Sequence, residues 1–346
     1  MKPSELLDET YARMRGTGPE FEGWLANHGP MAADALIRLG RADEVQRWVA
    51  GYLRKLEDAP GRRWLIDEKD WRDPLGDPSR LGDWCEFFGW LVRDRPWTEV
   101  LALWWPRLLP GAVASASHGL IRTGHVVRAL AEGVTPQRLD ELGQALGYWA
   151  ARWQPLPPAA RPVGTADAAA ALAATAPLGA SGGFRTRLGQ LEDAPDWSAA
   201  VARLRAPGRP ADVPAALDTL VDAAVTGYGQ WAHGSPIMMV HAATAPRAAA
   251  LVLPSLPEHL WVPTFERAWA VCAAITSIYR PSAPPPPASA TERVAPTADD
   301  VTDLAVASRD EHAIKFVEVA QESHRRGNSA ALTSGARAVV LITSDD

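Results

Sequence analysis

Apolar residues recur along most of the chain at spacings of three and four positions, the period of an amphipathic helix. Leu36, Leu39, Val45, Trp48 and Val49 follow this spacing inside two predicted helices, at 33–39 and 44–56. The same pattern predicts further helices at 84–92, 98–109, 114–131, 136–153, 213–228, 237–253, 265–279, 298–326 and 330–343. Strand alternation is almost absent, so we expect an all-α fold: one large multi-helix domain with a buried active-site cavity.

Two proline-rich stretches interrupt the helical pattern, at 154–164 and 280–298. Proline at this density does not suit a helix or a central strand, so we expect surface connectors. Either stretch could be a domain boundary. Candidate site residues lie on both sides of both stretches, which favours a single domain over residues 1–346. The alanine-rich run 166–176 fits either a closely packed helix or filler.

Composition narrows the class of protein. The 346 residues are 47% apolar and carry a net charge of only −6, so the chain can bury a core and is not disordered. Two cysteines are too few for a disulfide framework or a thiolate metal site, which fits a reducing compartment. The start lacks the apolar core of a signal peptide, and the apolar run 268–275 is shorter than the ~20 residues of a membrane span. With a pI of about 5.8, we expect a cytoplasmic protein without a membrane or nucleic-acid partner, and leave its oligomeric state open.

The most informative segment covers residues 117–128. In a helix, His118, Arg122 and His125 lie at i, i+4 and i+7 and share one face, and the apolar neighbours predict that this face points inward. The two histidines are then about 10.5 Å apart along the axis, too far to ligate one ion unless the helix starts or bends between them. Either histidine could instead be a core imidazole bonded to a backbone carbonyl.

Three other histidines lie in apolar segments or at expected helix starts: His28, His241 and His312. Lys315 follows His312 at i+3, on the same face of a predicted helix. A buried lysine is costly unless it is paired or chemically altered. Polar or proline-flanked neighbours predict a surface position for the remaining ones, His233, His259 and His324.

Several imidazoles without cysteines suit iron, copper or zinc, and together with an oxygen donor they suit non-haem ferrous iron. The carboxylate is not obvious. Asp34, Asp310 and Glu311 are the nearest candidates, but acidic residues beside helix starts are more often caps or solvated charges. The sequence has no H-E-x-x-H helix, no Walker loop and no G-x-G-x-x-G fingerprint.

Tryptophan is abundant, with 15 residues against 6 phenylalanines and 5 tyrosines. Indole faces could line a pocket for a flat aromatic substrate, or could simply fill a helical core. We expect most to be core residues and select Trp84, Trp90 and Trp231 as candidate substrate contacts.

Four segments resemble the questin oxidase family: NHGPMAADALIRLGRAD (27–43), SHGLIRTGHVVRAL (117–130), MMVHAATAPRAAALVLPSLP (238–257) and DEHAIKFVEVA (310–320). They occur in order along nearly the whole chain. The resemblance implies an all-helical oxidoreductase of polyketide secondary metabolism that opens a ring of an anthraquinone-type substrate with O2.

The resemblance implies two possible mechanisms. In one, a mononuclear non-haem iron dioxygenase holds Fe(2+) through histidines and a carboxylated lysine. The matching positions are His28, His118, His125, His241 and His312, with Lys315 as the lysine. In the other, a metal-independent Baeyer–Villiger-type monooxygenase uses NADPH.

We expect the iron-dependent oxygenase, acting on a small aromatic polyketide-like substrate. Under this hypothesis His118 and His125 are catalytic, and Arg122, one turn from His118, stabilises the negative charge that develops during the reaction. The chain is shorter than the fungal members, with a compact middle, so its substrate pocket is expected to differ. The alternatives are the NADPH-dependent monooxygenase, in which histidine is a general base, and a non-catalytic protein that binds an aromatic metabolite.

Overall fold

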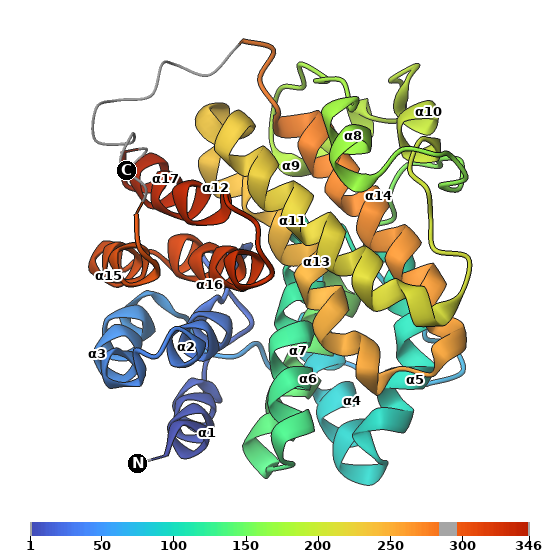
Figure 1. Ribbon diagram of the computed structural model, residues 1–346. Coiled ribbons are helices and arrows are strands. Elements are labelled where there is room, and N and C mark those ends of the chain that lie inside the picture. Colours follow the sequence, from blue (N-terminus) through green and yellow to red (C-terminus); the bar gives the residue numbers. More distant parts are fainter. Residues whose placement is uncertain (1, 284–295, 345–346) are drawn as a thin grey trace. The chain divides into compact units, whose positions relative to one another are not determined.

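The computed structural model describes residues 2–283 and 296–344, and its long elements are helices (Figure 1). Within these ranges the one sheet is a short antiparallel ribbon of β1 (Glu20–Phe21) and β2 (Leu25–Ala26). The predicted all-α fold is confirmed. The helices group into two compact units, described separately below: a first unit of Met1–Pro155 and Leu251–Leu260, and a second unit of Leu156–Ala250 and Trp261–Asp346.

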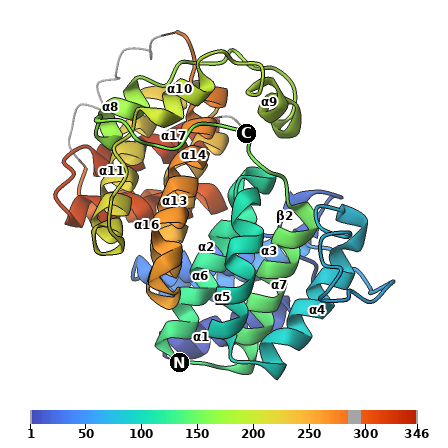
Figure 2. The ribbon, with the colours of Figure 1, turned by 90° about the vertical axis from the view of Figure 1, so that its right-hand side faces the viewer.

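The core of the first unit forms around α4 and α7, which pack along their lengths (Figure 2). Small residues allow this approach: a Cβ on Gly147 would lie 2.7 Å from the Cα of Cys85, and one on Gly143 would lie 2.8 Å from the Cα of Gly89. The helices of this unit are α1 (Pro3–Met14), α2 (Gly29–Arg38), α3 (Ala42–Tyr52), α4 (Leu81–Asp94), α5 (Trp97–Leu108), α6 (His118–Glu132) and α7 (Pro136–Arg152).

Two boundaries in the first unit differ from the prediction. Helix α1 was not predicted, although its apolar side chains, among them Leu7 and Tyr11, are buried. The predicted helix 114–131 begins four residues late, at His118, because the short turn Ala114–Ser117 precedes it in a non-helical conformation.

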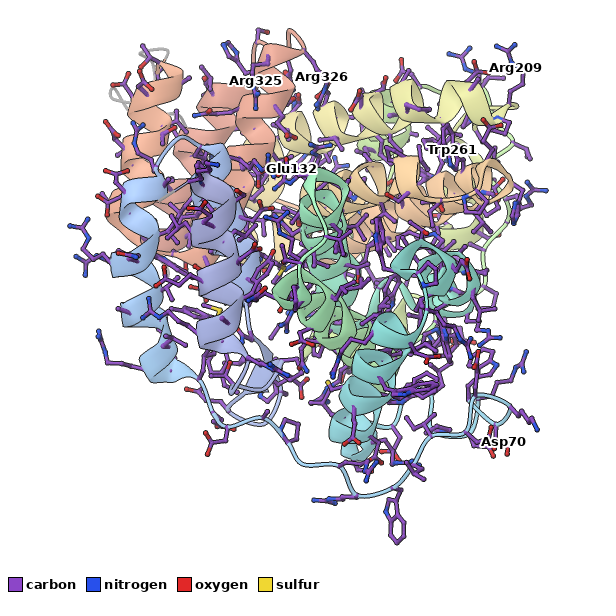
Figure 3. The ribbon with its side chains drawn as sticks, turned by 90° about the horizontal axis from the view of Figure 1, so that it is seen from below. Asp70, Glu132, Arg209, Trp261, Arg325 and Arg326 are labelled. Carbon is purple, nitrogen blue, oxygen red and sulfur yellow. The ribbon has the colours of Figure 1, made fainter. Side chains whose placement is uncertain are left out.

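The second unit contains α8 (Ala168–Ala173), α9 (Phe184–Gln190), α10 (Trp197–Ala202), α11 (Val213–Trp231), α12 (Pro236–Met239), α14 (Trp261–Tyr279), α15 (Ala298–Ser308), α16 (Glu311–Arg325) and α17 (Ala331–Ser344), and most of α13 (His241–Val252). Helices α15, α16 and α17 pack together. Arg326 follows Arg325 at the end of α16 (Figure 3) and donates a hydrogen bond to Asp222 of α11 at 2.5 Å. This contact links α16 to α11.

The single helix predicted at 298–326 is two helices. Arg309 adopts a left-handed conformation (φ 58°) that ends α15, and the Asp310 side chain then accepts hydrogen bonds from the backbone of His312 and Ala313 to begin α16. The left-handed residue is not glycine, so the composition of the segment gave no signal of the break.

The first proline-rich connector, 154–164, contains no helix and is largely exposed, and the division between the two units falls within it. Of the second, 280–298, residues 284–295 lie outside the described residues. The alanine-rich run forms α8 over Ala168–Ala173.

One helical stretch, Pro236–Ser255, is long and apolar enough to cross a membrane on length and composition alone. However, 72% of its most apolar window is buried inside the structure, and a buried core helix passes the same test. Among the described residues it is the one such stretch, so it is weak evidence for a membrane span.

Candidate functional site: two histidine pairs

Helix α6 begins from a strained backbone. Ser115, Ala116 and Ser117 have φ values of 47°, 53° and 68°, the left-handed region, which costs a non-glycine residue about 1–2 kcal/mol. The last two are buried, so the surrounding packing holds them in this conformation. Such strain persists at positions where the fold requires a particular geometry, often at functional sites. Here it places His118 at the first position of α6.

His118 faces His28, the residue directly before α2. Their Nε2 atoms are 2.7 Å apart, and the rings are nearly perpendicular, with an interplanar angle of 83°. Both side chains are buried. Two nitrogens that bind one ion at about 2.1 Å in neighbouring positions lie about 3 Å apart, so the spacing of this pair is close to that of two ligands of a single metal.

The other ring nitrogen of each histidine faces an oxygen that can accept its proton. Nδ1 of His118 donates to the backbone carbonyl of Ser115, so in the neutral ring the lone pair is on Nε2, the atom that faces His28. Nδ1 of His28 lies 3.5 Å from the hydroxyl of Tyr52, which also accepts the backbone N–H of His28 at 2.8 Å. Metal-binding histidines usually have such outer partners, which fix the tautomer and orient the ring.

His125 belongs to a different cluster, so its prediction as a ligand beside His118 is wrong. Helix α6 is continuous between His118 and His125. The possible metal ligands whose atoms lie within 4.8 Å of one another include His28 and His118, but not His125. Its Nδ1 lies 2.8 Å from the carboxylate of Asp34, which also accepts from Arg128 and, at 3.3 Å, from Arg38.

Asp34 is fully buried, not a solvated or capping charge. Burial alone would raise its pKa, but Arg128, His125 and Arg38 outweigh that effect and hold the pKa well below its usual range. The carboxylate is therefore ionised and anchors these three side chains.

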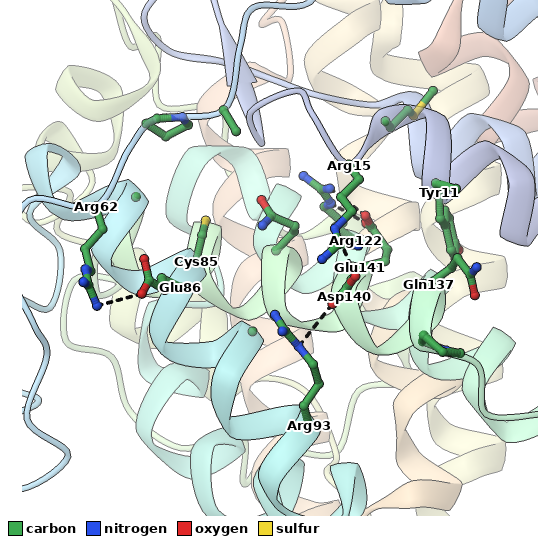
Figure 4. Close-up of a pocket in the computed structure, with 18 of the residues that line it drawn as sticks. Tyr11, Arg15, Arg62, Cys85, Glu86, Arg93, Arg122, Gln137, Asp140 and Glu141 are labelled. Atoms are coloured by element: carbon green, nitrogen blue, oxygen red, sulfur yellow. Dashed lines mark hydrogen bonds and ion pairs between the residues drawn. The ribbon is translucent and has the colours of Figure 1, made fainter.

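Arg122 is paired with a residue that the sequence did not reveal. Its Nε and Nη2 donate to the two carboxylate oxygens of Glu141 on α7, at 2.5 and 2.8 Å, and both side chains are buried (Figure 4). Burial would lower the pKa of Arg122, but Glu141 raises it, so the guanidinium stays charged. The predicted role beside His118 is not supported, because Glu141 already neutralises this charge.

The second unit contains its own histidine pair. His241 is the first residue of α13, and His312 lies in the first turn of α16; their ring centroids are 5.8 Å apart. Nδ1 of His241 donates to the carbonyl of Met238 at 3.1 Å, so its Nε2 carries the lone pair in the neutral ring. Asp310 caps α16, and although burial opposes it, hydrogen bonds from His312 and the backbone lower the pKa of Asp310 to about 2.

Lys315 lies one turn after His312 and is only 1% exposed. Among the described residues its Nζ has no hydrogen-bond partner. Burial lowers its pKa to about 8, although Glu311 and Asp310 act in the opposite direction. A larger share of the amine is then neutral at physiological pH, the form that adds CO2. This environment is compatible with the expected carbamate, which stays a prediction.

The selected tryptophans do not form a substrate wall. Trp84 is fully buried and packs against Phe88 and Trp104, so it is a core residue, and Trp90 is 54% exposed on the surface. The prediction for Trp84 is therefore wrong, and that for Trp90 stays a prediction. Trp231 is half-buried, and the guanidinium of Arg280 lies 4.4 Å over its ring.

The histidines expected at the surface differ among themselves. His259 and His324 are exposed, as predicted. His233 is half-buried, and both of its ring nitrogens are covered by protein.

No family model and no curated protein matches this sequence. The resemblance to questin oxidases therefore depends on the four segments alone. The fold and the residues define an all-α protein with buried histidine pairs, and histidines of this chain lie close enough together to be compatible with a metal ion.

Proposed function

We propose that this protein is an oxidoreductase that uses O2 at a mononuclear non-haem iron to oxygenate or cleave a ring of an aromatic polyketide-like substrate. The observation that carries the proposal is the buried pair His28 and His118, whose Nε2 atoms face each other at 2.7 Å. Two unprotonated imidazole nitrogens at this distance repel unless a proton or a cation lies between them.

The donor set fits ferrous iron better than a softer metal site. Both cysteines are buried, and burial raises the pKa of each thiol to about 12, so neither supplies a thiolate. Imidazole nitrogen suits iron, and His28 and His118 would fill two of its positions. When bound, the iron would supply Lewis acidity and a redox centre for the reaction of O2 with a phenolic substrate.

The residues around the pair would orient it. The Ser115 carbonyl fixes the His118 tautomer, and the strained turn sets the position from which its ring points. Tyr52, stacked on Trp48 with ring centroids 4.8 Å apart, holds both the backbone and the ring of His28. Rigid outer partners of this kind support metal affinity, and their loss typically costs about 10–100-fold.

The substrate class and the remaining ligands come from the resemblance. His241, His312 and Lys315 match family segments and are buried, with ring orientation and amine environment compatible with metal binding. They belong to the proposal as expected ligands, each to be tested by its own substitution.

The test is metal analysis of protein purified without chelator, together with O2 consumption on a hydroxylated anthraquinone. We expect near-stoichiometric iron, its loss in His28→Ala and His118→Ala, and unchanged iron in the exposed control His324→Ala. The same measurement on His241→Ala, His312→Ala and Lys315→Met assigns the other expected ligands. Activity that survives chelation and requires NADPH would support the metal-independent monooxygenase instead. Binding of the anthraquinone without turnover in the iron-loaded protein would support a binding protein.

A further inference from the structure

The first unit contains a pocket of about 370 Å³, a size within the range of small-molecule sites (Figure 4). Its wall comes from α1, α4, α6 and α7 and from the segment 59–62. Apolar atoms of Ala12, Met14 and Pro136 form part of the lining, and arginine and carboxylate side chains form much of the rest. The pocket can therefore take a molecule with an apolar body and a charged group.

The charges of the lining do not cancel. It contains four arginines and three carboxylates: Arg15, Arg62, Arg93, Arg122, Glu86, Asp140 and Glu141. Arg62 pairs with Glu86 at 2.7 Å, and Arg122 pairs with Glu141. Asp140 is shared, because Arg15 and Arg93 each lie 3.3 Å from it. One positive charge is left without its own carboxylate, so the pocket is suited to a monoanion.

Arg122 has a donor left over. Glu141 occupies the Nε and Nη2 edge of the guanidinium, whereas Nη1 is buried and has no hydrogen-bond partner among the described residues. The side chain is 4% exposed. A buried donor without a partner is destabilising, and a hydrogen bond to a ligand oxygen would remove this penalty.

A second donor of the same kind lies in this wall. The hydroxyl of Tyr11 is also buried without a hydrogen-bond partner among the described residues. Burial, with Asp34 and Glu141, raises its pKa well above the usual value, so it stays a protonated donor. The thiol of Cys85, whose pKa burial raises to about 12, is not a nucleophile there. The wall therefore offers hydrogen bonds and no covalent chemistry.

We propose that this pocket binds a small organic carboxylate, whose oxygens accept from Nη1 of Arg122 and the hydroxyl of Tyr11 while its apolar body lies against Ala12, Met14 and Pro136. The pocket is larger than an inorganic anion needs, and its apolar wall favours an organic body. This binding site does not depend on the iron proposal, because none of the histidine pairs lines it.

The test compares 2-naphthoate with 2-naphthamide, a neutral probe of nearly the same shape, by isothermal titration calorimetry on the full chain. We expect the carboxylate to bind at least about tenfold more tightly, because hydrogen bonds to its charged oxygens are stronger than those to a neutral amide oxygen. Tyr11→Phe keeps the ring and removes one donor, so it should weaken naphthoate binding by about fivefold and leave naphthamide unchanged.

Two further variants separate the buried donor from the overall charge. Glu141→Gln adds net positive charge and should tighten naphthoate binding. The double variant Arg122→Met with Glu141→Gln keeps the net charge of the lining but places a side chain without a donor at position 122, so it should abolish the preference. Arg47→Gln, at an exposed ion pair with Glu44 outside the pocket lining, is the control and should change affinity less than twofold. Melting curves without probe establish that each variant is folded. The proposal is overturned if wild-type protein binds naphthoate no better than naphthamide, or if a folded Tyr11→Phe or the double variant keeps the full preference.

Discussion

Replacing Asp34 with asparagine tests the contribution of the buried ionic cluster to the stability of the first unit. The carboxylate is fully buried and holds His125, Arg128 and Arg38, and asparagine keeps its shape while removing the charge. Removing one partner of a buried ion pair costs about 3–5 kcal/mol, because the other charges stay buried. Asparagine keeps part of the hydrogen bonding, so we expect the lower end, about 3 kcal/mol. For a unit of this size that corresponds to a fall in Tm of about 6–12 °C.

The difference in stability between wild type and Asp34→Asn should decrease as the pH falls. The pKa of Asp34 is lower in the folded protein than its unfolded value near 4, because Arg128 and His125 outweigh the effect of burial. The stabilisation is therefore fully present above pH 4 and is lost as the pH falls through the folded pKa. Wild type and Asp34→Asn should differ most at pH 6–7, and their Tm values should converge as the pH drops below 4.

The assay is thermal unfolding followed by circular dichroism at several pH values. Asp140→Asn is the matched control, because Asp140 contacts two largely exposed arginines and should change the free energy of unfolding by less than about 1 kcal/mol. A Tm of Asp34→Asn within 1–2 °C of wild type at pH 7, or a difference that grows on acidification, would refute the reasoning.

Three other substitutions test separate features. Ala116→Gly relieves a left-handed residue (φ 53°) and should raise the free energy of unfolding by about 1 kcal/mol in urea titration, and a loss of stability would contradict the strain assigned to the turn. In Gly147→Val even the added Cβ would lie 2.7 Å from Cα of Cys85, so this substitution should destabilise the protein by several kcal/mol. The control Gly183→Val, at an exposed position, should change the free energy of unfolding by less than about 1 kcal/mol. Lys315→Met removes a buried amine whose pKa of about 8 lies below the usual 10.5. In bicarbonate-free buffer the substitution should stabilise the protein by up to about 3 kcal/mol at pH 7. This gain should shrink between pH 8 and 10.5, because the wild-type protein becomes more stable as Lys315 loses its proton. A gain independent of pH would contradict that pKa.

The helices were largely predictable because burial leaves a period in the sequence. The spacing of Leu36 and Leu39 or of Val45 and Trp48 identified α2 and α3, and the prolines identified the first connector. The break at Arg309 was missed, because a left-handed residue that is not glycine leaves no compositional signal.

The site was predictable only in part, since pairing across helices has no local pattern. His28 and His118 were selected from apolar context and resemblance, but their facing geometry depends on the left-handed turn before His118, which the residues Ser115 to Ser117 do not reveal. Glu141 was missed as the partner of Arg122, because the two lie 19 residues apart on different helices. Tryptophan content carried no positional information, so Trp84 was selected although it is a core residue.

The most direct test of the central claim is the iron content of the protein measured by mass spectrometry after purification without chelator. We predict about one iron per chain in wild type and in His324→Ala, and less than about a tenth of that in folded His118→Ala, whose lost Nε2 faces His28. Wild-type protein without bound metal, or His118→Ala with the full iron content, would contradict the account.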